Sequence, residues 1–447
     1  MGSSVFPPAK TAKFPLNPDQ KNHSSIFTSF FAQGSNHDSD PTLRGLSLDP
    51  FEGGLYDFTM RKLPLLFFAI ILGASMLCQA KPKNKPQPDN PQKDAGFRQL
   101  FTSLFTEWDS NGDGVLDMKE LNAAIENPDV HGSDAAIAVY LHRHLQVDKE
   151  GQVNGLSLAD VQALAASPDV QKIITSRAWH IEAINHSLFV PGDPNLATFH
   201  QGGIGDCYLL AVIGTYAFQH PEMVREMIQV QTNGGFEIEF GTGRTVEVGP
   251  LTDSELIMGA SEGRDHGVWL SVLEKAYAQI DLENKERKTG QAIEAEDAVD
   301  TDFIGHGGYY SPVIVLLSGH KVQGAPLGRW VKQDPQGGLE KAHELMAKLS
   351  VEHRLMATGS SGDKTKKLPK GIVHGHIYGV LGYNPVTRMV TVFNPWGNQV
   401  KPKGPPGLVN GYPTEHGIFE VPLDEFVQIF AGFTYETDKP AAQKVAG

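Results

Sequence analysis

A glycine-rich segment that ends in a cysteine and runs into apolar residues constrains the fold of this chain most. Residues 201–207 read Gln-Gly-Gly-Ile-Gly-Asp-Cys, and an apolar run at 211–214 follows shortly afterwards. That run is typical of a buried helix, which would place the sulfur of Cys207 at or near a helix N-terminus, where the dipole and free N–H groups favour a thiolate. The segment predicts a nucleophile, and a small buried structural cysteine is the alternative.

The position of the second cysteine supports a chemical role for the first. The chain has two cysteines, and Cys78 lies in a segment with the character of a signal peptide. A short basic stretch precedes the apolar residues 63–77, and small side chains follow them. We predict a signal peptide over residues 60–80, because the apolar stretch is too short to cross a bilayer. Its removal would leave Cys207 alone in an exported chain, where cysteines usually occur in pairs.

Two later segments carry residues that complete a thiol-based site. Residues 373–381 alternate small or polar with apolar side chains, and residues 389–393 form an apolar run that leads into Asn-Pro-Trp-Gly. Both patterns predict β-strands. A thiol nucleophile needs an imidazole to take its proton, and His376 supplies one. The carbonyl of Asn394 can orient that imidazole without adding charge.

Four motifs in this order resemble the catalytic core of calpain-family cysteine proteases. They are Gln-Gly-x-x-Gly-Asp-Cys-x-Leu-Leu at 201–210, a helix-like stretch at 268–278, Gly-His-x-Tyr at 375–378 and Asn-Pro-Trp-Gly at 394–397. The resemblance covers residues 195–436. It implies an α+β, papain-like fold of two lobes, with a helical lobe over about 195–300 and a sheet-rich lobe over about 301–436.

The resemblance also implies a role for individual residues. Cys207 would be the nucleophile, His376 the general base and acid, and Asn394 the residue that orients His376. Gln201 would donate its side-chain amide to the oxyanion, with the backbone N–H of Cys207 as the second donor. Trp396 resembles the family tryptophan that shields the His–Asn hydrogen bond from water.

Three details bear on these assignments. Tyr208 stands where the family usually has tryptophan, which affects the shape of a subsite more than the chemistry. His374 competes with His376, because residues two apart on a strand face the same side; the Gly-His-x-Tyr spacing favours His376. Asn394 also fits an ordinary turn after a strand, since Asn-Pro is common there.

An EF-hand loop precedes the protease-like region. Residues 109–120, Asp-Ser-Asn-Gly-Asp-Gly-Val-Leu-Asp-Met-Lys-Glu, fill every position of a twelve-residue calcium loop. The predicted Ca²⁺ ligands are Asp109, Asn111, Asp113, the backbone carbonyl of Val115, Asp117 and bidentate Glu120. Apolar residues at helical spacing flank the loop on both sides. An acidic turn without a metal ion is the alternative.

EF-hands usually pair, and residues 148–156 fall at about the right distance for a partner loop. The spacing of their oxygen-bearing side chains is irregular and no Glu closes the loop, so we predict a degenerate partner that packs without binding calcium. The predicted module spans residues 96–190 and precedes the core, whereas known calpains carry such modules after it. Its connection through residues 170–198 gives it no obvious lever on the cleft, so calcium is expected to stabilise more than to switch.

Composition limits the other possibilities. The formal net charge of −14 argues against a nucleic-acid partner, and no segment after the signal peptide is apolar and long enough to span a membrane. Residues 1–59 predict a disordered extension or a start assigned upstream of a true initiator at Met60. Residues 81–95 predict a Pro-rich linker, and residues 437–447 a tail. Nothing in the sequence indicates an oligomeric state.

These patterns predict an exported calcium-binding, calpain-like cysteine endopeptidase, secreted or periplasmic, that acts on proteins or peptides. One alternative is a transglutaminase-like acyl transferase with a similar triad, although the orienting residue of that class is usually Asp rather than Asn. The other is an inactive protease fold that serves as a calcium-dependent binding module.

Overall fold

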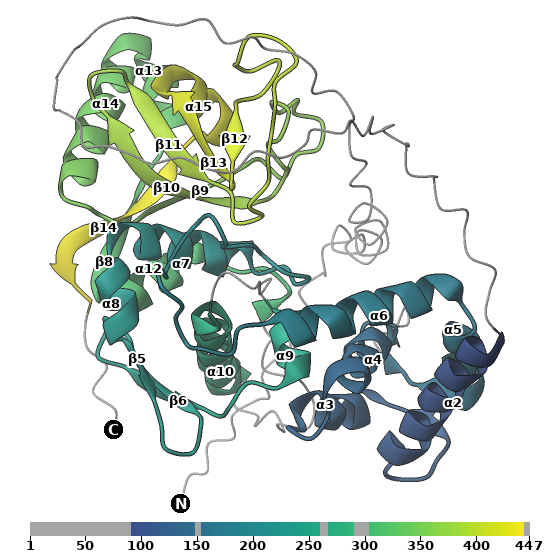
Figure 1. The fold of residues 1–447 in the computed structure, drawn as a ribbon. Helices are drawn as coiled ribbons and strands as arrows, with labels where there is room; N and C mark the ends of the chain where they lie inside the picture. The colour runs from purple at the N-terminus through teal and green to yellow at the C-terminus, as the bar shows by residue number, and fades with distance from the viewer. Residues whose placement is uncertain (1–90, 148–152, 260–266, 290–303, 442–447) are drawn as a thin grey trace, which may run out of the picture. The chain divides into compact units, whose positions relative to one another are not determined.

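The computed structural model describes residues 91–147, 153–259, 267–289 and 304–441 (Figure 1). The predicted signal peptide and the extension before it lie outside the described residues. We divide the described chain into an N-terminal module (91–183), a helical body (207–318) and a sheet body (320–440), linked by residues 184–206. Among the helices of these ranges, none combines the length and the apolar character needed to cross a bilayer.

The N-terminal module is built mainly from helices around one hydrophobic cluster. α4 is its central helix, because every residue from 135 to 142 is buried, as expected of a helix that is apolar on all sides. Its elements are α2 (Pro91–Trp108), β1 (Val115–Leu116), α3 (Met118–Glu126), α4 (Gly132–His142), β2 (Gln146–Val147), β3 (Val153–Asn154), β4 (Leu156–Ser157), α5 (Leu158–Ala165) and α6 (Pro168–Ala183).

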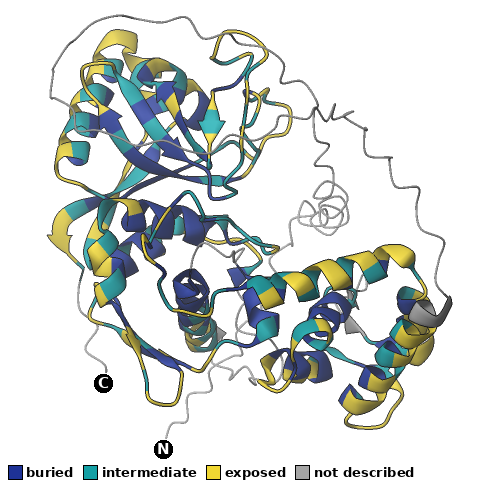
Figure 2. Ribbon diagram, in the orientation of Figure 1, coloured by how far each residue is buried: buried dark blue, intermediate teal, exposed yellow. Residues whose placement is uncertain are grey.

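The helical body is centred on α7, which starts at the cysteine of the glycine-rich segment. All residues of α7 from Tyr208 to Ala217 are buried, as Figure 2 shows along the helix. This agrees with the helix predicted from the apolar run. The elements are α7 (Cys207–Gln219), α8 (Pro221–Glu226), β5 (Ile228–Val230), β6 (Phe236–Glu239), β7 (Thr245–Val248), α9 (Asp253–Met258), α10 (Trp269–Thr289) and α12 (Tyr310–Ser318). Ile314 on α12 belongs to the same cluster as α7, so this core continues beyond the boundary expected at about residue 300.

The sheet body contains a seven-stranded antiparallel sheet with the strand order β12-β13-β11-β10-β9-β14-β8. Its elements are β8 (His320–Ala325), α13 (Leu327–Gln333), α14 (Pro335–Val351), β9 (Met356–Gly359), β10 (Ile377–Asn384), β11 (Met389–Phe393), β12 (Thr414–Glu415), β13 (Ile418–Pro422), α15 (Leu423–Phe430) and β14 (Phe433–Pro440). β14 includes residues 437–440, which the sequence had placed in a tail.

Both faces of this sheet are covered. Successive residues of a strand face opposite sides, so one strand can contribute side chains to two different clusters. On β11, Val392 packs into the cluster of the sheet body, whereas its neighbour Phe393 packs into the cluster of α7. The sheet therefore lies between α7 on one face and the helices α14 and α15 on the other. Figure 1 shows this layering.

The close approach of α7 and β10 depends on Gly379. A β-carbon at this position would lie 2.8 Å from the carbonyl oxygen of Ala211 and would also meet the hydroxyl of Thr215. A glycine therefore allows the backbone of β10 to rest on the helix that begins at Cys207, and any larger residue would separate the two.

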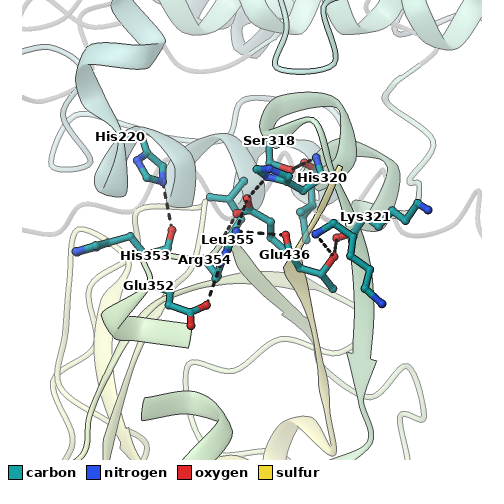
Figure 3. Close-up of polar contacts among 12 residues, drawn as sticks. His220, Ser318, His320, Lys321, Glu352, His353, Arg354, Leu355 and Glu436 are labelled. Carbon is teal, nitrogen blue, oxygen red and sulfur yellow. Dashed lines mark hydrogen bonds and ion pairs between the residues drawn. The ribbon is translucent and has the colours of Figure 1, made fainter. Parts of the chain in front are cut away.

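A buried carboxylate, Glu436 on β14, joins the strands where the two bodies meet (Figure 3). One oxygen lies 2.6 Å from Nδ1 of His320 and 3.6 Å from Nη1 of Arg354. The other accepts a hydrogen bond of 3.0 Å from the backbone N–H of Leu355. With an imidazole, a guanidinium and an amide N–H as partners, the carboxylate is buried together with groups that compensate its charge.

Candidate active site

Cys207 is the first residue of α7, as the sequence predicted, and is only partly exposed. The backbone before it is held from two directions. The N–H of Gln201 donates to the carbonyl of Pro395 at 2.7 Å, and the N–H of Gly205 donates to the carbonyl of Gly305 at 3.0 Å. The first bond ties the segment before the cysteine to the loop that follows β11.

His376 and Asn394 meet at the same end of two neighbouring strands of the sheet. β10 begins at the residue after His376, β11 ends at the residue before Asn394, and the two strands are antiparallel, with Gly379 opposite Phe393. The start of one strand therefore lies beside the end of the other. Nε2 of His376 lies 2.8 Å from Oδ1 of Asn394 in a buried hydrogen bond. Nδ1 is the ring nitrogen left for another partner.

The thiol of Cys207 lies beside this pair. The backbone N–H of Ile377, the residue after His376, hydrogen-bonds to the thiol and lowers its pKa. The structure thus brings a cysteine, a histidine and an asparagine from three separate segments into one site. Tyr208, by contrast, is buried against Tyr277, with ring centroids 6.1 Å apart, so it serves core packing.

The strand expected over residues 373–381 begins only at Ile377, and this difference separates the two histidines. Gly375 has a φ of 63°, a left-handed conformation that ends an extended strand. His374 therefore does not share a strand face with His376. Nδ1 of His374 lies 3.2 Å from the carbonyl oxygen of Ser361, away from Asn394.

Asn398 is part of the site and was missed by the sequence reasoning. The Nδ2 amide of Asn394 donates to Oδ1 of Asn398 at 3.0 Å, and the backbone N–H of Trp396 donates to Oδ1 of Asn394 at 3.1 Å. Together these bonds fix which amide atom of Asn394 faces His376. The signal available in the sequence was the second asparagine in Asn-Pro-Trp-Gly-Asn.

Trp396 covers the His–Asn pair. Its ring centroid lies 4.7 Å from that of His376, at an interplanar angle of 48°. Asn394 is 1% exposed and His376 is 4% exposed. The hydrogen bond between them is therefore kept from water, which strengthens it electrostatically.

The protonation state of the site differs from the expected thiolate. The pKa of Cys207 is raised to about 11: burial is the main cause and nearby Asp206 adds to it, while the N–H groups of Ile377, Tyr208 and Cys207 act in the opposite direction. The helix N-terminus thus acts in the predicted direction but is outweighed by the loss of hydration. Burial also lowers the pKa of His376 to about 4, although the hydrogen bond that its ring donates to Asn394 raises it. Near neutral pH the resting pair is a neutral thiol and a neutral imidazole.

Gln201 does not face an oxyanion position in this structure. Its Nε2 amide donates to the carbonyl oxygen of Ile204 at 2.7 Å, within its own loop. Its side chain also lies near the carboxyl of Asp206 and lowers the pKa of that group. The predicted oxyanion donor is therefore close to Cys207 but oriented towards its own loop.

A second feature missed in the sequence is a pair of buried carboxyl groups behind the nucleophile. Asp206 and Glu274 are both 0% exposed. Burial raises the pKa of Asp206 to about 6, although the nearby side chains of Glu274 and Gln201 lower it. Neither carboxylate oxygen of Asp206 has a hydrogen-bond partner among the described residues, so this group is buried without compensation. The signal in the sequence was a glutamate inside the apolar stretch at 268–278.

The predicted calcium loop closes on itself through Glu120. One carboxylate oxygen of Glu120 accepts from the backbone N–H of Ser110 at 2.9 Å and of Asn111 at 3.2 Å. The other accepts from the N–H of Asp117, whose own side chain accepts from the N–H of Glu120. This capping box starts α3.

The donor set of this loop suits calcium by its chemistry. Every predicted side-chain ligand is a carboxylate or amide oxygen, the type that Ca²⁺ prefers. The two carboxylate oxygens of Asp109 accept from the N–H groups of Gly112 and Gly114 at 2.9 and 3.0 Å, which wraps the loop around that residue. Within the described ranges no group of three or more His, Cys, Asp and Glu side chains is placed to hold a metal ion.

The pairing of short strands revises the register of the second loop. β1 pairs with β4, and Leu116 lies opposite Leu156. Asp160, four residues after Leu156, therefore matches Glu120, four residues after Leu116, and it forms the same capping box with Ser157. The second loop thus extends past residue 156, and Asp160 was missed as its closing residue. Residues 148–152 of this loop lie outside the described ranges.

Comparisons with known proteins agree with the geometry. A family profile described as "Calpain family cysteine protease" matches residues 156–405. Calpain-9 of Homo sapiens is 23% identical over 48% of this chain and 30% of its own length. Calpain-8 of Mus musculus is 26% identical over 52% of this chain and 32% of its own length. The calpain-type cysteine protease DEK1 of Arabidopsis thaliana is 27% identical, over 48% of this chain and 10% of its own length. The chain thus spans about a third or less of these relatives.

Proposed function

The chain belongs to the calpain family of cysteine proteases, as the sequence motifs indicated, and we propose that it is an exported, calcium-binding endopeptidase. Cys207, His376 and Asn394 would carry the reaction. The observation that carries this proposal is the buried 2.8 Å contact between His376 and Asn394, with the thiol of Cys207 against the next backbone amide. Cleavage of an unstructured protein by the wild type and by Cys207→Ala tests it, with amine incorporation measured in parallel to detect acyl transfer.

The proposed reaction follows from the free ring nitrogen of His376. The sulfur of Cys207 attacks the peptide carbonyl carbon, its proton passes to Nδ1 of His376, and the carbonyl oxygen becomes an oxyanion. Collapse breaks the C–N bond, and His376 returns the proton to the leaving amine. Water then hydrolyses the thioester, with His376 taking a proton from the water and returning it to the sulfur. Asn394 keeps Nε2 engaged throughout.

Substrate has to change the resting site before this reaction proceeds. The oxyanion has the backbone N–H of Cys207 available, whereas the amide of Gln201 must leave the carbonyl of Ile204. Proton transfer from sulfur to imidazole is also unfavourable while burial holds the pKa of Cys207 near 11 and that of His376 near 4. A bound peptide that supplies hydrogen bonds to the loop would favour both the release of the Gln201 amide and the transfer of the proton.

Replacing Asn394 with Asp is expected to move the acid limb of activity to higher pH. His376 must be unprotonated to act as a base, so activity of the wild type should fall as the pH drops towards about 4. A carboxylate at 394 keeps the acceptor but stabilises the imidazolium, which raises the pKa of His376. Asn394→Ala removes the bond that raises this pKa and should move the limb the other way. Profiles of kcat/KM against pH measure both shifts; an unmoved limb would show that another group controls it.

We propose that the loop from Asp109 to Glu120 binds one Ca²⁺ ion, and we expect Glu120→Gln to weaken binding strongly. The substitution removes one negative charge and one oxygen from the bidentate ligand. Calorimetric titration of the whole chain measures the affinity, and the unfolding temperature with and without calcium measures the stabilisation. Asp160→Asn in the second loop is the matched control and should leave the affinity unchanged. Equal calcium affinities for wild type and Glu120→Gln would contradict this site.

Export is proposed from the basic and apolar pattern of residues 60–80. The export machinery would cleave after Ala80, and the N-terminal sequence of the exported form tests this directly. A mature chain that still begins upstream of residue 60 would contradict it.

A further inference from the structure

The N-terminal module docks on the helical body through α9 and the residue before it. The hydroxyl of Thr252 donates to the carbonyl of Ile125 on α3 at 2.7 Å. The carboxylate of Asp253 accepts from the backbone N–H of Gly132, at the start of α4, at 2.9 Å. Met258, at the end of α9, is 1% exposed and belongs to the hydrophobic cluster of the module. Polar bonds and shared core together give this contact one defined geometry.

Arg143 connects this docking contact to the segment before Cys207. It caps the C-terminal end of α4, and its Nη2 donates to the carbonyl of Met258 at 3.2 Å. Its guanidinium also lies against Gly203: a β-carbon on that glycine would be 2.6 Å from Nη2 and 2.7 Å from Nη1. The guanidinium thus fills the space that a side chain at 203 would need. The sequence reasoning, which saw no obvious lever on the cleft, did not anticipate this contact.

The loop touched by Arg143 has few contacts of its own. Three of the five residues between Gln201 and Cys207 are glycines, which lack side chains and leave the backbone unusually free. The two ends of the loop are fixed by the backbone bonds of Gln201 and Gly205. Gly203 lies between these ends, where the guanidinium rests on it.

A second connection runs from the same carbonyl towards the nucleophile. Gly259 follows Met258, and a β-carbon on Gly259 would be 2.8 Å from the carboxylate of Glu274. Glu274 is fully buried, as is Asp206, the residue before Cys207, and Glu274 lies close enough to Asp206 to affect the pKa of that carboxyl. The backbone beside the Arg143 contact therefore packs on a buried carboxyl group that neighbours the catalytic loop.

We propose that Arg143 is a positioning residue for the loop over residues 201–206, so that the N-terminal module is part of the construction of the active site. This inference rests on the proposed function. Arg143 touches neither substrate nor the reacting atoms; it holds the backbone that sets the places of Gln201 and the N–H of Cys207. Loss of the contact should therefore lower kcat more than it raises KM.

The matched pair Arg143→Ala and Gly203→Ala tests the contact from both sides. Each should lower kcat by about 10- to 100-fold, the effect of a small misplacement of reacting groups. The methyl group of Gly203→Ala displaces the guanidinium while leaving the docking bonds of Thr252 and Asp253 in place. The double variant should be no worse than either single variant, because both remove the same contact. Lys172→Ala, an exposed cation on α6 of the same module, should leave kcat unchanged.

The rate of alkylation of Cys207 by iodoacetamide gives a second readout. If Arg143 only stabilised the fold, this rate and kcat would not change together. The alkylation rate should change by the same factor in both single variants, at temperatures where unfolding curves show each chain folded. Wild-type kcat in Arg143→Ala would overturn the inference, provided that Cys207→Ala is inactive. Additive losses in the double variant would also overturn it. Activity that survives in Cys207→Ala would instead overturn the proposed function.

Discussion

Replacing Cys207 with alanine or serine is expected to abolish cleavage while leaving the fold intact. The side chain of Cys207 is small, and it begins a helix whose remaining residues supply the packing. Alanine removes the nucleophile, and the hydroxyl of serine is a far poorer one, because the imidazole of this site is a weak base with a pKa near 4. We expect activity to fall to the background of the assay.

The unfolding temperature serves as the control for both Cys207 variants, and it should stay close to that of the wild type. Undiminished cleavage by Cys207→Ala would remove the protease assignment. Cleavage that survives only in Cys207→Ser would show that the site activates an alcohol. A neutral imidazole that is bonded to an amide is not expected to do so near neutral pH.

The second large effect is expected from His376→Ala, with His374→Ala as its matched control. Removing the base should lower kcat/KM by about 10²- to 10⁴-fold, because His376 bonds to Asn394 and directly precedes Ile377, whose backbone N–H contacts the thiol. His374 contacts the carbonyl of Ser361 instead, so its loss should cost far less. Steady-state kinetics on one peptide substrate rank the two variants, and the opposite ranking would assign the base to His374.

Local patterns predicted the elements that carry the site. The apolar run after Cys207 gave a helix because a stretch that is apolar on all sides has to be buried, and α7 spans Cys207–Gln219. The run over residues 389–393 gave a strand that β11 matches residue by residue. The strand before it was predicted too early, since Gly375 turns the chain before Ile377. The mixed helix and sheet class agrees with a calpain core, whereas calcium binding by the helix–loop–helix segment stays a prediction.

Several of the features that sequence reasoning missed depend on contacts between distant segments. Arg143 and Gly203 are 60 positions apart in the sequence, and no local pattern around either residue predicts that they are in contact. The burial of Asp206 close to Glu274 likewise requires α7 and α10 to be placed first. The thiolate expectation was wrong for a related reason: the helix N-terminus is a local property, whereas the burial that outweighs it is set by the whole fold.

The last described strand of the chain lies in the interior of the sheet, and this affects the order in which the strands of the sheet can assemble. β14 lies between β9 and β8, and β8 pairs with no other strand of the described sheet. During synthesis, β8 has to wait more than a hundred residues for the neighbour that fixes it, because residue 320 pairs with residue 440. Contacts of such long sequence separation form late. A growing chain that already contains Cys207, His376 and Asn394 but not β14 still lacks the strand that joins β8 to β9, so this sheet is completed only once residues 433–440 have been made.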